Sequence, residues 1–296
     1  MKKPEIKTIE REQCTYYFDP EAKPALVVEK GETVCFKTTD CYGGQISYDG
    51  IDFSEIDIKK MNPVTGPLYI EGAEPGDVLA VEILDIIPDE KGKMCVRQGS
   101  GVCEVEGYHC RVFPIKDNKI LFDHDVEIPI KPMIGVIGTC PKEKCDTKSP
   151  GRHGGNLDIK DVCKNCTVYL PVEVTGGLLS IGDCHAIQGD GESGVCGMEM
   201  NAEVVVRVGI IKGGKGIPTP LIEAADKIIT AYADESLDKA AVGAGRMMHR
   251  YLTENTPYNN SQAAMMISLV ANLRISQVVN PKKGCIMEFP TEYLIE

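Results

Sequence analysis

The sequence has no apolar segment long enough to cross a membrane as a helix. None of its hydrophobic runs approaches the ~18 consecutive apolar residues that a membrane-spanning helix needs. The first residues, MKKPEIKTIEREQ, contain early lysines with no apolar stretch after them, so we expect no signal peptide. Both absences predict a cytoplasmic protein without membrane contact.

Positive charge is scarce. The 296 residues carry 32 Lys and Arg against 44 Asp and Glu, a formal net charge of −12. Neutralising nucleic-acid phosphates requires a basic surface, so this balance argues against a general nucleic-acid binder. An acidic surface is typical of a soluble globular protein and remains compatible with a small neutral substrate or a divalent cation.

Cysteine, by contrast, is plentiful, with 13 residues. Without an export signal we expect free thiols in a reducing compartment. Cys163 and Cys166 form a CxxC, and Cys140 and Cys145 precede it. The irregular spacing of the two pairs disfavours a four-thiolate zinc site, so we expect most cysteines to be small buried hydrophobes. The role of the CxxC is left open.

Strand patterns separated by Gly, Pro and Asp turns dominate residues 1–215. Residues 78–87 and 203–211 are rich in β-branched side chains. Residues 25–38 are apolar at both ends of a Lys-Gly turn, and a Gly pair separates 167–174 from 178–181, so both segments suggest hairpins. Many short strands of this kind predict a mainly β fold, a sandwich or barrel.

The pattern becomes helical after about residue 220. Apolar residues in 236–252 and 261–273 recur at helical spacing, with Asp234 or Ser236 as the N-cap of the first segment and Ser261 as the cap of the second. Strand-like RISQVV and CIMEF follow. We therefore predict one domain over 1–296, with a β-rich core (1–215) and a helical hairpin with closing strands (216–296).

Residues 182–192, GDCHAIQGDGE, concentrate ionisable groups among glycines. If the preceding strand continues, Asp183 and His185 project to one face and Cys184 to the other. A carboxylate beside an imidazole suits zinc or a similar divalent ion. Asp190 and Glu192 alternate with glycines that let backbone approach a ligand. A GDGE turn alone is usually a solvated loop, but four such groups in one run favour a functional site.

Two weaker clusters lie upstream. His153 stands among glycines in SPGRHGGNLDIKD (149–161), with Asn156 and Asp158 just after, and Asp40 ends a predicted strand before a glycine pair and Gln45. Taken alone, each reads as a loop or turn. The remaining histidines, His109, His124 and His249, lack a supporting cluster and are read as structural.

Together these segments resemble the acetamidase/formamidase family. The matching motifs are NPVTGPLYIEGAEPGD (62–77), KPMIGVIG (131–138), HGGN (153–156), GDCHAIQGDGE (182–192) and RISQVVNP (274–281), and the resemblance runs from about residue 5 to the C-terminus. It implies hydrolysis of short-chain amides such as acetamide or formamide to a carboxylate and ammonia.

The resemblance also implies a β-sandwich core with α/β decoration, an active-site metal, commonly a homodimer, and zinc as the ion with calcium as a companion. Carried onto this chain, the polar motif positions are Asp40, His153, Asn156, Asp183, His185, Asp190 and Glu192. The family pattern is not followed at Cys184, Gln188, Ser193 and the CKNC segment, so the resemblance does not define the substrate pocket.

Our mechanistic hypothesis is a metal-dependent amidohydrolase. The proposed metal ligands are Asp40, Asp183 and His185, together with His153. Glu192 would move the proton from water to the departing amine. Asp190 would orient a ligand or bind a second cation, and Asn156, with the amides of Gly154 and Gly155, would stabilise the oxyanion.

Two alternatives use the same residues differently. Cys184 could be a nucleophile activated by His185, although strand alternation places the two side chains on opposite faces. A non-enzymatic β-sandwich could instead hold calcium to bind a small ligand. The histidines argue against it, because calcium prefers oxygen ligands.

Overall fold

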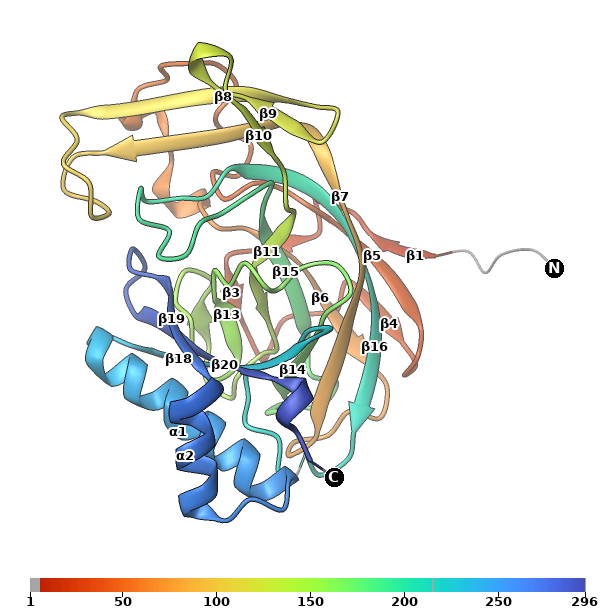
Figure 1. Cartoon of the computed structure of the whole chain (residues 1–296). Helices are drawn as coiled ribbons and strands as arrows, with labels where there is room; N and C mark the ends of the chain where they lie inside the picture. The colour runs from red at the N-terminus through yellow and green to blue at the C-terminus, as the bar shows by residue number, and fades with distance from the viewer. Residues whose placement is uncertain (1–5, 215, 296) are drawn as a thin grey trace.

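The computed structural model describes residues 6–214 and 216–295. Most of the regular structure is strand, and the chain folds around antiparallel sheets (Figure 1). The strands are β1 Lys7–Ile9, β2 Cys14–Thr15, β3 Tyr17–Phe18, β4 Leu26–Val28, β5 Thr33–Thr38, β6 Val64–Ile70, β7 Val78–Arg97, β8 Tyr108–Lys116, β9 Lys119–Leu121, β10 Glu127–Pro129, β11 Met133–Gly138, β12 Cys145–Asp146, β13 Gly154–Asn156, β14 Thr167–Pro171, β15 Leu179–His185, β16 Glu199–Ile211, β17 Leu221–Glu223, β18 Lys227–Asp234, β19 Asn272–Gln277 and β20 Lys283–Pro290. The helices are α1 Leu237–Asn255 and α2 Asn260–Val270, and short 3-10 turns lie at Phe53–Glu55, Ile58–Lys60, Asp123–Asp125 and Thr291–Tyr293.

Two long strands organise the sheet that carries the site. β16 pairs antiparallel with β7 on one side and with β5 on the other. β7 continues past the region paired with β14 and pairs with β8 near its C-terminal end. In β7, buried Leu79, Val81 and Ile83 alternate with half-buried neighbours, which gives the strand one face toward the core.

β15 is buried along its whole length, because it lies between β11 and β6 and also pairs with β16 at its end. A strand covered on both faces can hold polar side chains only if other groups satisfy them. The C-terminal end of β15 is where such side chains occur.

The two predicted hairpins are wrong. β4 pairs in parallel with β6, whereas β5 pairs with β1 and β16. β14 pairs with β7 and β17, and β15 joins other strands, so the strands around the Gly176-Gly177 turn separate. Isolated two-stranded hairpins are marginal in water, and these strands pair instead with strands that are distant in the sequence.

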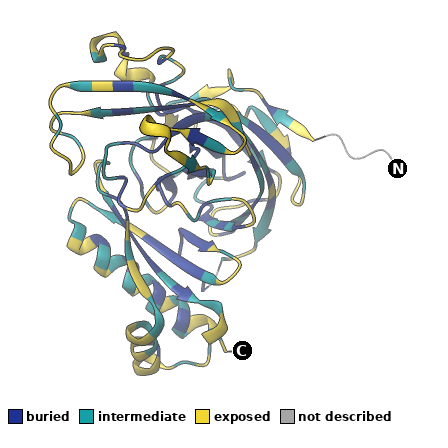
Figure 2. Cartoon of the chain, turned by 45° about the horizontal axis from the view of Figure 1, so that its top comes forward, coloured by how far each residue is buried: buried dark blue, intermediate teal, exposed yellow. Residues whose placement is uncertain are grey.

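The predicted mainly β fold with a C-terminal helical pair is confirmed. Of the two predicted N-cap candidates, Asp234 and Ser236, it is Ser236 that caps α1 by accepting from the amide of Lys239. The cap of α2 is Asn259, in a capping box with Gln262, rather than Ser261. α1 packs on β18 and β20, and α2 lies at the outside of the molecule with a largely exposed surface (Figures 1 and 2). Within the described residues, neither helix has the length and apolar character that spanning a membrane would require.

Candidate active site

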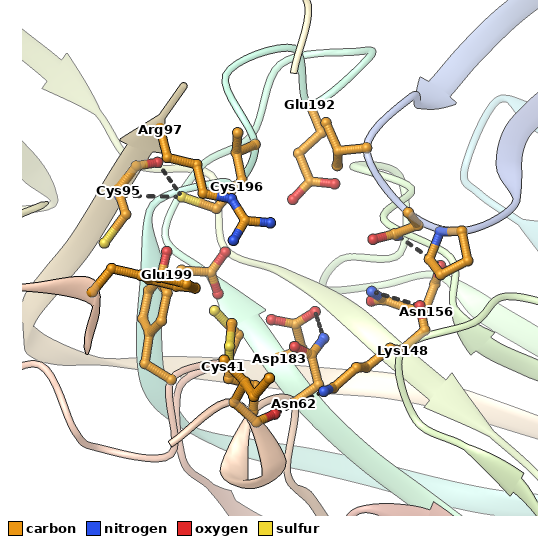
Figure 3. A pocket seen from close by; sticks show the side chains of 18 of the residues that line it. Cys41, Asn62, Cys95, Arg97, Lys148, Asn156, Asp183, Glu192, Cys196 and Glu199 are labelled. Atoms are coloured by element: carbon orange, nitrogen blue, oxygen red, sulfur yellow. Dashed lines mark hydrogen bonds between the residues drawn. The ribbon is translucent and has the colours of Figure 1, made fainter. Parts of the chain in front are cut away.

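A cavity of about 400 Å³ lies where several strand ends and loops meet (Figure 3). The end of β7, the start of β8, the ends of β13 and β15 and the start of β16 all contribute to it, together with the loops after β5 and β19. Its lining residues are Cys41, Tyr42, Phe53, Ile58, Met61, Asn62, Cys95, Arg97, Tyr108, Lys148, Asn156, Asp183, Glu192, Val195, Cys196, Glu199, Val279, Asn280 and Pro281.

Five buried ionisable side chains gather at this cavity. We call them the acidic cluster: Asp158, Asp183, His185, Glu192 and Glu199. Asp183, Glu192 and Glu199 line the cavity itself. Asp158, His185 and Glu192 offer ligand atoms within 4.8 Å of one another, and so do Cys41, Asp183 and Glu199.

His185 connects the members of the acidic cluster. Its Nε2 lies 3.3 Å from Oδ1 of Asp183 and 3.1 Å from Oε1 of Glu199. Its Nδ1 is 2.8 Å from Oε1 of Gln188. Gln188 in turn donates through Nε2 to the carbonyl of Asp158, which fixes its amide orientation. Nδ1 of His185 must therefore carry a proton, and Nε2 is the nitrogen turned toward the carboxylates.

Glycines make room for this arrangement. A Cβ at Gly135 of β11 would lie 2.6 Å from Oδ1 of Asp158 and 2.9 Å from Oδ2 of Asp183. A Cβ at Gly197 would lie 2.5 Å from Nδ1 of His185. Asp183 itself has a φ of 53°, in the left-handed region, which interrupts the extended run that the sequence suggested. Asp183 and His185 nevertheless lie in contact.

Three asparagines orient the carboxylates. Asn62 donates to Oδ2 of Asp183 at 3.3 Å, and Asn280 donates to Oδ2 of Asp158 at 2.6 Å. With its Nδ2 turned to the carboxylates, Asn156 donates to Asp183 at 2.9 Å and to Asp158 at 3.2 Å. These amides hold the acids in place without neutralising their charge.

The acidic cluster is short of positive charge. Among the described residues, the ion pairs of its four carboxylates involve only His185. Oδ1 of Asp158, Oε2 of Glu192 and Oε2 of Glu199 are buried and have no hydrogen-bond partner within residues 6–214 and 216–295. A buried carboxylate without compensation is costly, so the group needs protons or a cation.

The pKa values follow from this imbalance. Burial, and then the charge of Asp183, raise the pKa of Asp158 to about 6. Burial and the charge of Asp158 raise the pKa of Glu192 well above its usual value. Burial opposes the charged imidazole, but Glu199 and Asp183 outweigh it and raise the pKa of His185 well above its usual value. Such shifts are typical of functional sites.

Two predicted metal ligands lie apart from the acidic cluster. Asp40 is fully buried, but its Oδ2 pairs with Lys93 and its Oδ1 accepts from the amides of Tyr42 and Gly44. His153 packs against Phe18, and its Nε2 lies 3.6 Å from Sγ of Cys145. Neither residue lines the cavity.

In the HGGN segment the amide of Gly154, one of the two predicted oxyanion donors, already has a backbone partner. The amide of Gly154 donates to the carbonyl of Gly151, and β13 pairs with β11. Of this segment only Asn156 reaches the cavity.

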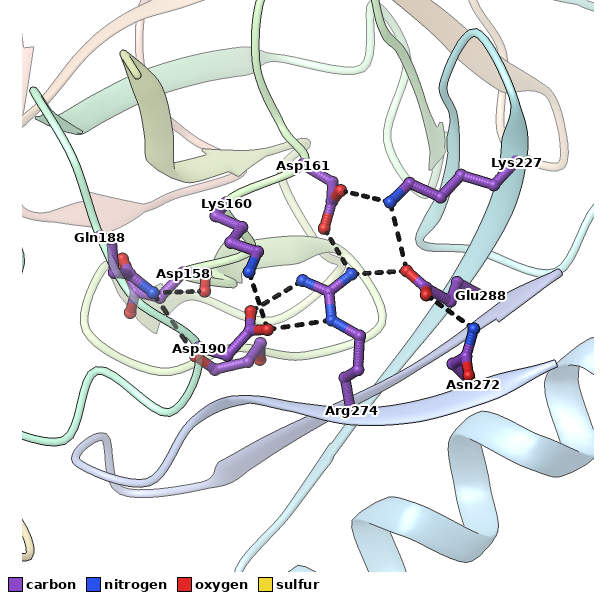
Figure 4. Close-up of polar contacts among 10 residues, drawn as sticks. Asp158, Lys160, Asp161, Gln188, Asp190, Lys227, Asn272, Arg274 and Glu288 are labelled. Carbon is purple, nitrogen blue, oxygen red and sulfur yellow. Dashed lines mark hydrogen bonds and ion pairs between the residues drawn. The ribbon is translucent and has the colours of Figure 1, made fainter. Parts of the chain in front are cut away.

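Asp190 belongs to an ion network outside the cavity (Figure 4). Arg274 of β19 contacts both of its oxygens, at 3.0 and 2.7 Å, and Lys160 contacts Oδ2 at 2.8 Å. The next residue, Gly191, exchanges backbone bonds with Ser276 and Val278. Asp190 thus ties the loop that carries Glu192 to the end of β19.

Cys184 points into the apolar core, as strand alternation predicted. It is fully buried, its Sγ contacts the hydroxyl of Thr38 at 3.5 Å, and it does not line the cavity. Burial raises the pKa of this thiol to about 12. A buried thiol of this kind is a poor nucleophile.

Sequence reasoning missed Glu199 and gave Asp158 no role. Glu199 stands opposite His185 in the β15–β16 register, in the sequence GMEM. A lone glutamate flanked by apolar residues at the start of a β-branched strand was the available signal. Neither group of potential metal ligands in the described residues includes Cys140, Cys145, Cys163 or Cys166.

Comparison with known proteins gives consistent matches. The model of the Acetamidase/Formamidase family matches residues 3–146 and 140–294. A putative formamidase of Schizosaccharomyces pombe is 31% identical over 262 residues, 66% of this chain and 63% of that protein. The formamidase of Methylophilus methylotrophus is 28% identical over 274 residues, 69% of this chain and 66% of that protein. The chain thus spans 63 to 66% of the length of these curated relatives.

Solved structures agree over almost the whole chain. An acetamidase from Bacillus halodurans superposes with a TM-score of 0.94 at 38% identity, covering 97% of this chain and 98% of that one. A predicted acetamidase/formamidase from Thermoanaerobacter tengcongensis superposes with a TM-score of 0.93 at 38% identity, covering 97% and 96%.

Proposed function

The chain belongs to the acetamidase/formamidase family, and from that premise we propose that it is a metal-dependent amidohydrolase. Its substrates are carboxylic amides, with acetamide and formamide as the first to test. The observation that carries the proposal is the acidic cluster, in which four buried carboxylates surround one histidine at a cavity.

A divalent cation fits this donor set. Oε2 of Glu199 is buried without a hydrogen-bond partner in the part of the chain that the structure describes, and Nε2 of His185 faces Asp183 and Glu199. We propose Asp183, His185 and Glu199 as the residues that hold the ion, and we leave out Asp40 and His153 because each has other partners. Mixed nitrogen and oxygen donors suit zinc better than calcium, which prefers oxygen alone. A bound ion of this kind supplies a Lewis acid and lowers the pKa of water from about 16 to about 7.

Glu192 is the proposed proton carrier. It lines the cavity, and its Oε2 is free of hydrogen bonds. Burial and the charge of Asp158 raise the pKa of Glu192, so its carboxyl can hold a proton as well as release one. Glu192 takes the proton from the attacking water and delivers it to the amide nitrogen, which leaves as ammonia.

Asn156 is the proposed positioning residue on the other side of the cluster. It lines the cavity and contacts Asp183 and Asp158. By donating to both carboxylates it holds the proposed ligand Asp183 in place beside Asp158.

The two alternatives from the sequence have less support. A nucleophilic Cys184 would have to leave the core to reach a substrate. A non-catalytic calcium module would not need an imidazole whose tautomer is fixed by Gln188.

The cytoplasmic location and the homodimer remain part of the proposal. Met265, Leu269 and Leu273 on α2 and β19 are more than half exposed, which supports a second copy covering this face. Analytical ultracentrifugation tests the dimer.

The test of function is ammonia release from acetamide and formamide, before and after chelation, with zinc added back. Turnover that disappears with the chelator and returns with zinc supports the proposal. Turnover that persists in protein shown to be free of metal removes the ion from the mechanism, and absence of turnover in zinc-loaded protein on both amides contradicts the activity itself.

A further inference from the structure

Part of the cavity lining consists of apolar and aromatic side chains. We call it the apolar wall: Tyr42, Phe53, Ile58, Met61 and Tyr108. Phe53 and Tyr108 contact each other with ring centroids 5.1 Å apart. Ile58 is 55% exposed. Apolar surface left open to a cavity gains free energy when a ligand covers it.

Hydrogen bonds from residues outside the apolar wall fix its backbone. Gln45 accepts from the amide of Asp57 at 2.8 Å and donates to the carbonyl of Tyr42 at 2.7 Å. Lys148 donates to the carbonyl of Ile58 at 2.8 Å. A Cβ at Gly43 would lie 2.5 Å from the carbonyl oxygen of Lys60, so a glycine is needed there. The motif around Asp40 and Gln45 therefore shapes the cavity, and the wall is preorganised for a ligand.

The cavity is larger than acetamide requires. Acetamide has four non-hydrogen atoms and, at roughly 30 Å³ for each water-sized group, occupies on the order of 100 Å³. The cavity measures about 400 Å³. Space for a larger acyl group remains beside the apolar wall.

The two cations near the wall, Arg97 and Lys148, contact only neutral groups, and neither belongs to an ion pair among the described residues. The guanidinium of Arg97 lies over Phe53, 5.1 Å from the ring centroid, and its Nε donates to Ser100 at 2.7 Å. The ammonium group of Lys148 donates a hydrogen bond to the backbone carbonyl of Ile58. The carboxylates of the acidic cluster would repel an anionic substrate.

From these observations we infer a substrate class, which rests on the proposed function. The substrate is a neutral primary amide whose carbonyl carries an alkyl or aryl chain of about four to seven carbons, with the amide at the acidic cluster and the chain against the apolar wall.

The experiment measures kcat/KM of the zinc-loaded full chain on formamide, acetamide, butyramide, hexanamide and phenylacetamide. We expect an increase of about fourfold for each methylene that the wall buries. If kcat/KM stays constant or falls for amides longer than acetamide, the inference is overturned while amide hydrolysis stands. A preference for the anionic succinamate over hexanamide also overturns it. Absence of turnover on every amide contradicts the proposed function and the inference together.

Variants assign the effect to the wall. Phe53→Ala should lower the ratio of kcat/KM for hexanamide to that for acetamide by about tenfold. The milder Phe53→Leu serves if the alanine variant folds poorly. Phe122→Ala is the matched control, because Phe122 is 41% exposed and does not line the cavity. An unchanged ratio in folded Phe53→Ala and Phe53→Leu would overturn the inference.

Discussion

His185 and Glu199 lie directly opposite each other across strands β15 and β16, with Nε2 of the histidine 3.1 Å from Oε1 of the glutamate. The two residues are 14 positions apart, and the intervening loop returns to the cavity with Glu192. The strand pairing thus brings ligand groups and the proposed proton carrier to one place.

Replacing Glu192 by Gln should abolish proton transfer while preserving the fold and the ion. We expect kcat for acetamide to fall by about 10²- to 10⁴-fold, the usual contribution of a general acid–base group. Ammonia release and the zinc content of the purified protein are the measurements. Glu235→Gln, at an exposed position, is the control. Normal turnover in Glu192→Gln would falsify the assignment.

Gln188→Ala should weaken ion binding. The side-chain amide of Gln188 accepts from Nδ1–H of His185 and holds Nε2 toward the carboxylates. Loss of such an orienting partner typically costs about 10- to 100-fold in metal affinity. Competition for zinc with a chromophoric chelator measures the change, with exposed Gln98→Ala as the control. Equal zinc affinity in both variants would show that Gln188 does not orient a ligand.

Cys184→Ala should remain active. The thiol is buried in the core and turned away from the cavity, so removing it should change kcat by less than about twofold while costing some stability. Steady-state kinetics on the folded variant decide the matter. Loss of turnover with an intact fold and zinc content would instead favour the cysteine mechanism.

Asp190→Asn should reduce activity without changing its pH dependence. Asp190 lies in the ion network with Arg274 and holds the loop of Glu192. We expect kcat to fall by about tenfold, because small displacements of a catalytic group are costly. The pH–rate profile should keep its shape, since the residue transfers no proton. A loss as large as in Glu192→Gln, with a flattened profile, would return Asp190 to a catalytic role.

Because His153 is buried, we expect the free energy of unfolding to depend on pH. Burial lowers the pKa of His153 from 6.5 to about 4 in the folded protein. Between pH 6.5 and pH 4 the unfolded chain therefore binds more protons at His153 than the folded protein does. The free energy of unfolding is thus highest, as far as His153 is concerned, above about pH 6.5, and it falls as the pH drops toward 4. The loss amounts to about 3 kcal/mol for this one group.

Urea unfolding at several pH values measures this effect. In His153→Gln the slope of the unfolding free energy between pH 4 and 6.5 should decrease relative to that of the unaltered protein. His109→Gln, at a more exposed histidine, is the control. Identical slopes in His153→Gln and the unaltered protein would show that His153 is not buried in its neutral form.

Much of the local structure could be predicted because its causes are local. Ser236 caps α1 through an amide three residues away, and the apolar spacing of 236–252 marks the buried face of the helix. The order of groups in 182–192 also placed Asp183 beside His185 and Cys184 on the opposite face.

The sequence by itself therefore determined the mainly β class, the helical pair and the identity of the central polar motif, since periodicity and capping act over a few residues. Only the tertiary structure decided which side chains share the site. Glu199 joins His185 through strand register, Asp158 joins through the room left by Gly135, and Asp190 turns away because Arg274 binds it. The separation of β14 from β15 at Gly176 and the pairing of β4 with β6 were decided in the same way. Each of these outcomes depends on contacts between residues distant in sequence, where burial and pairing outweigh local preference.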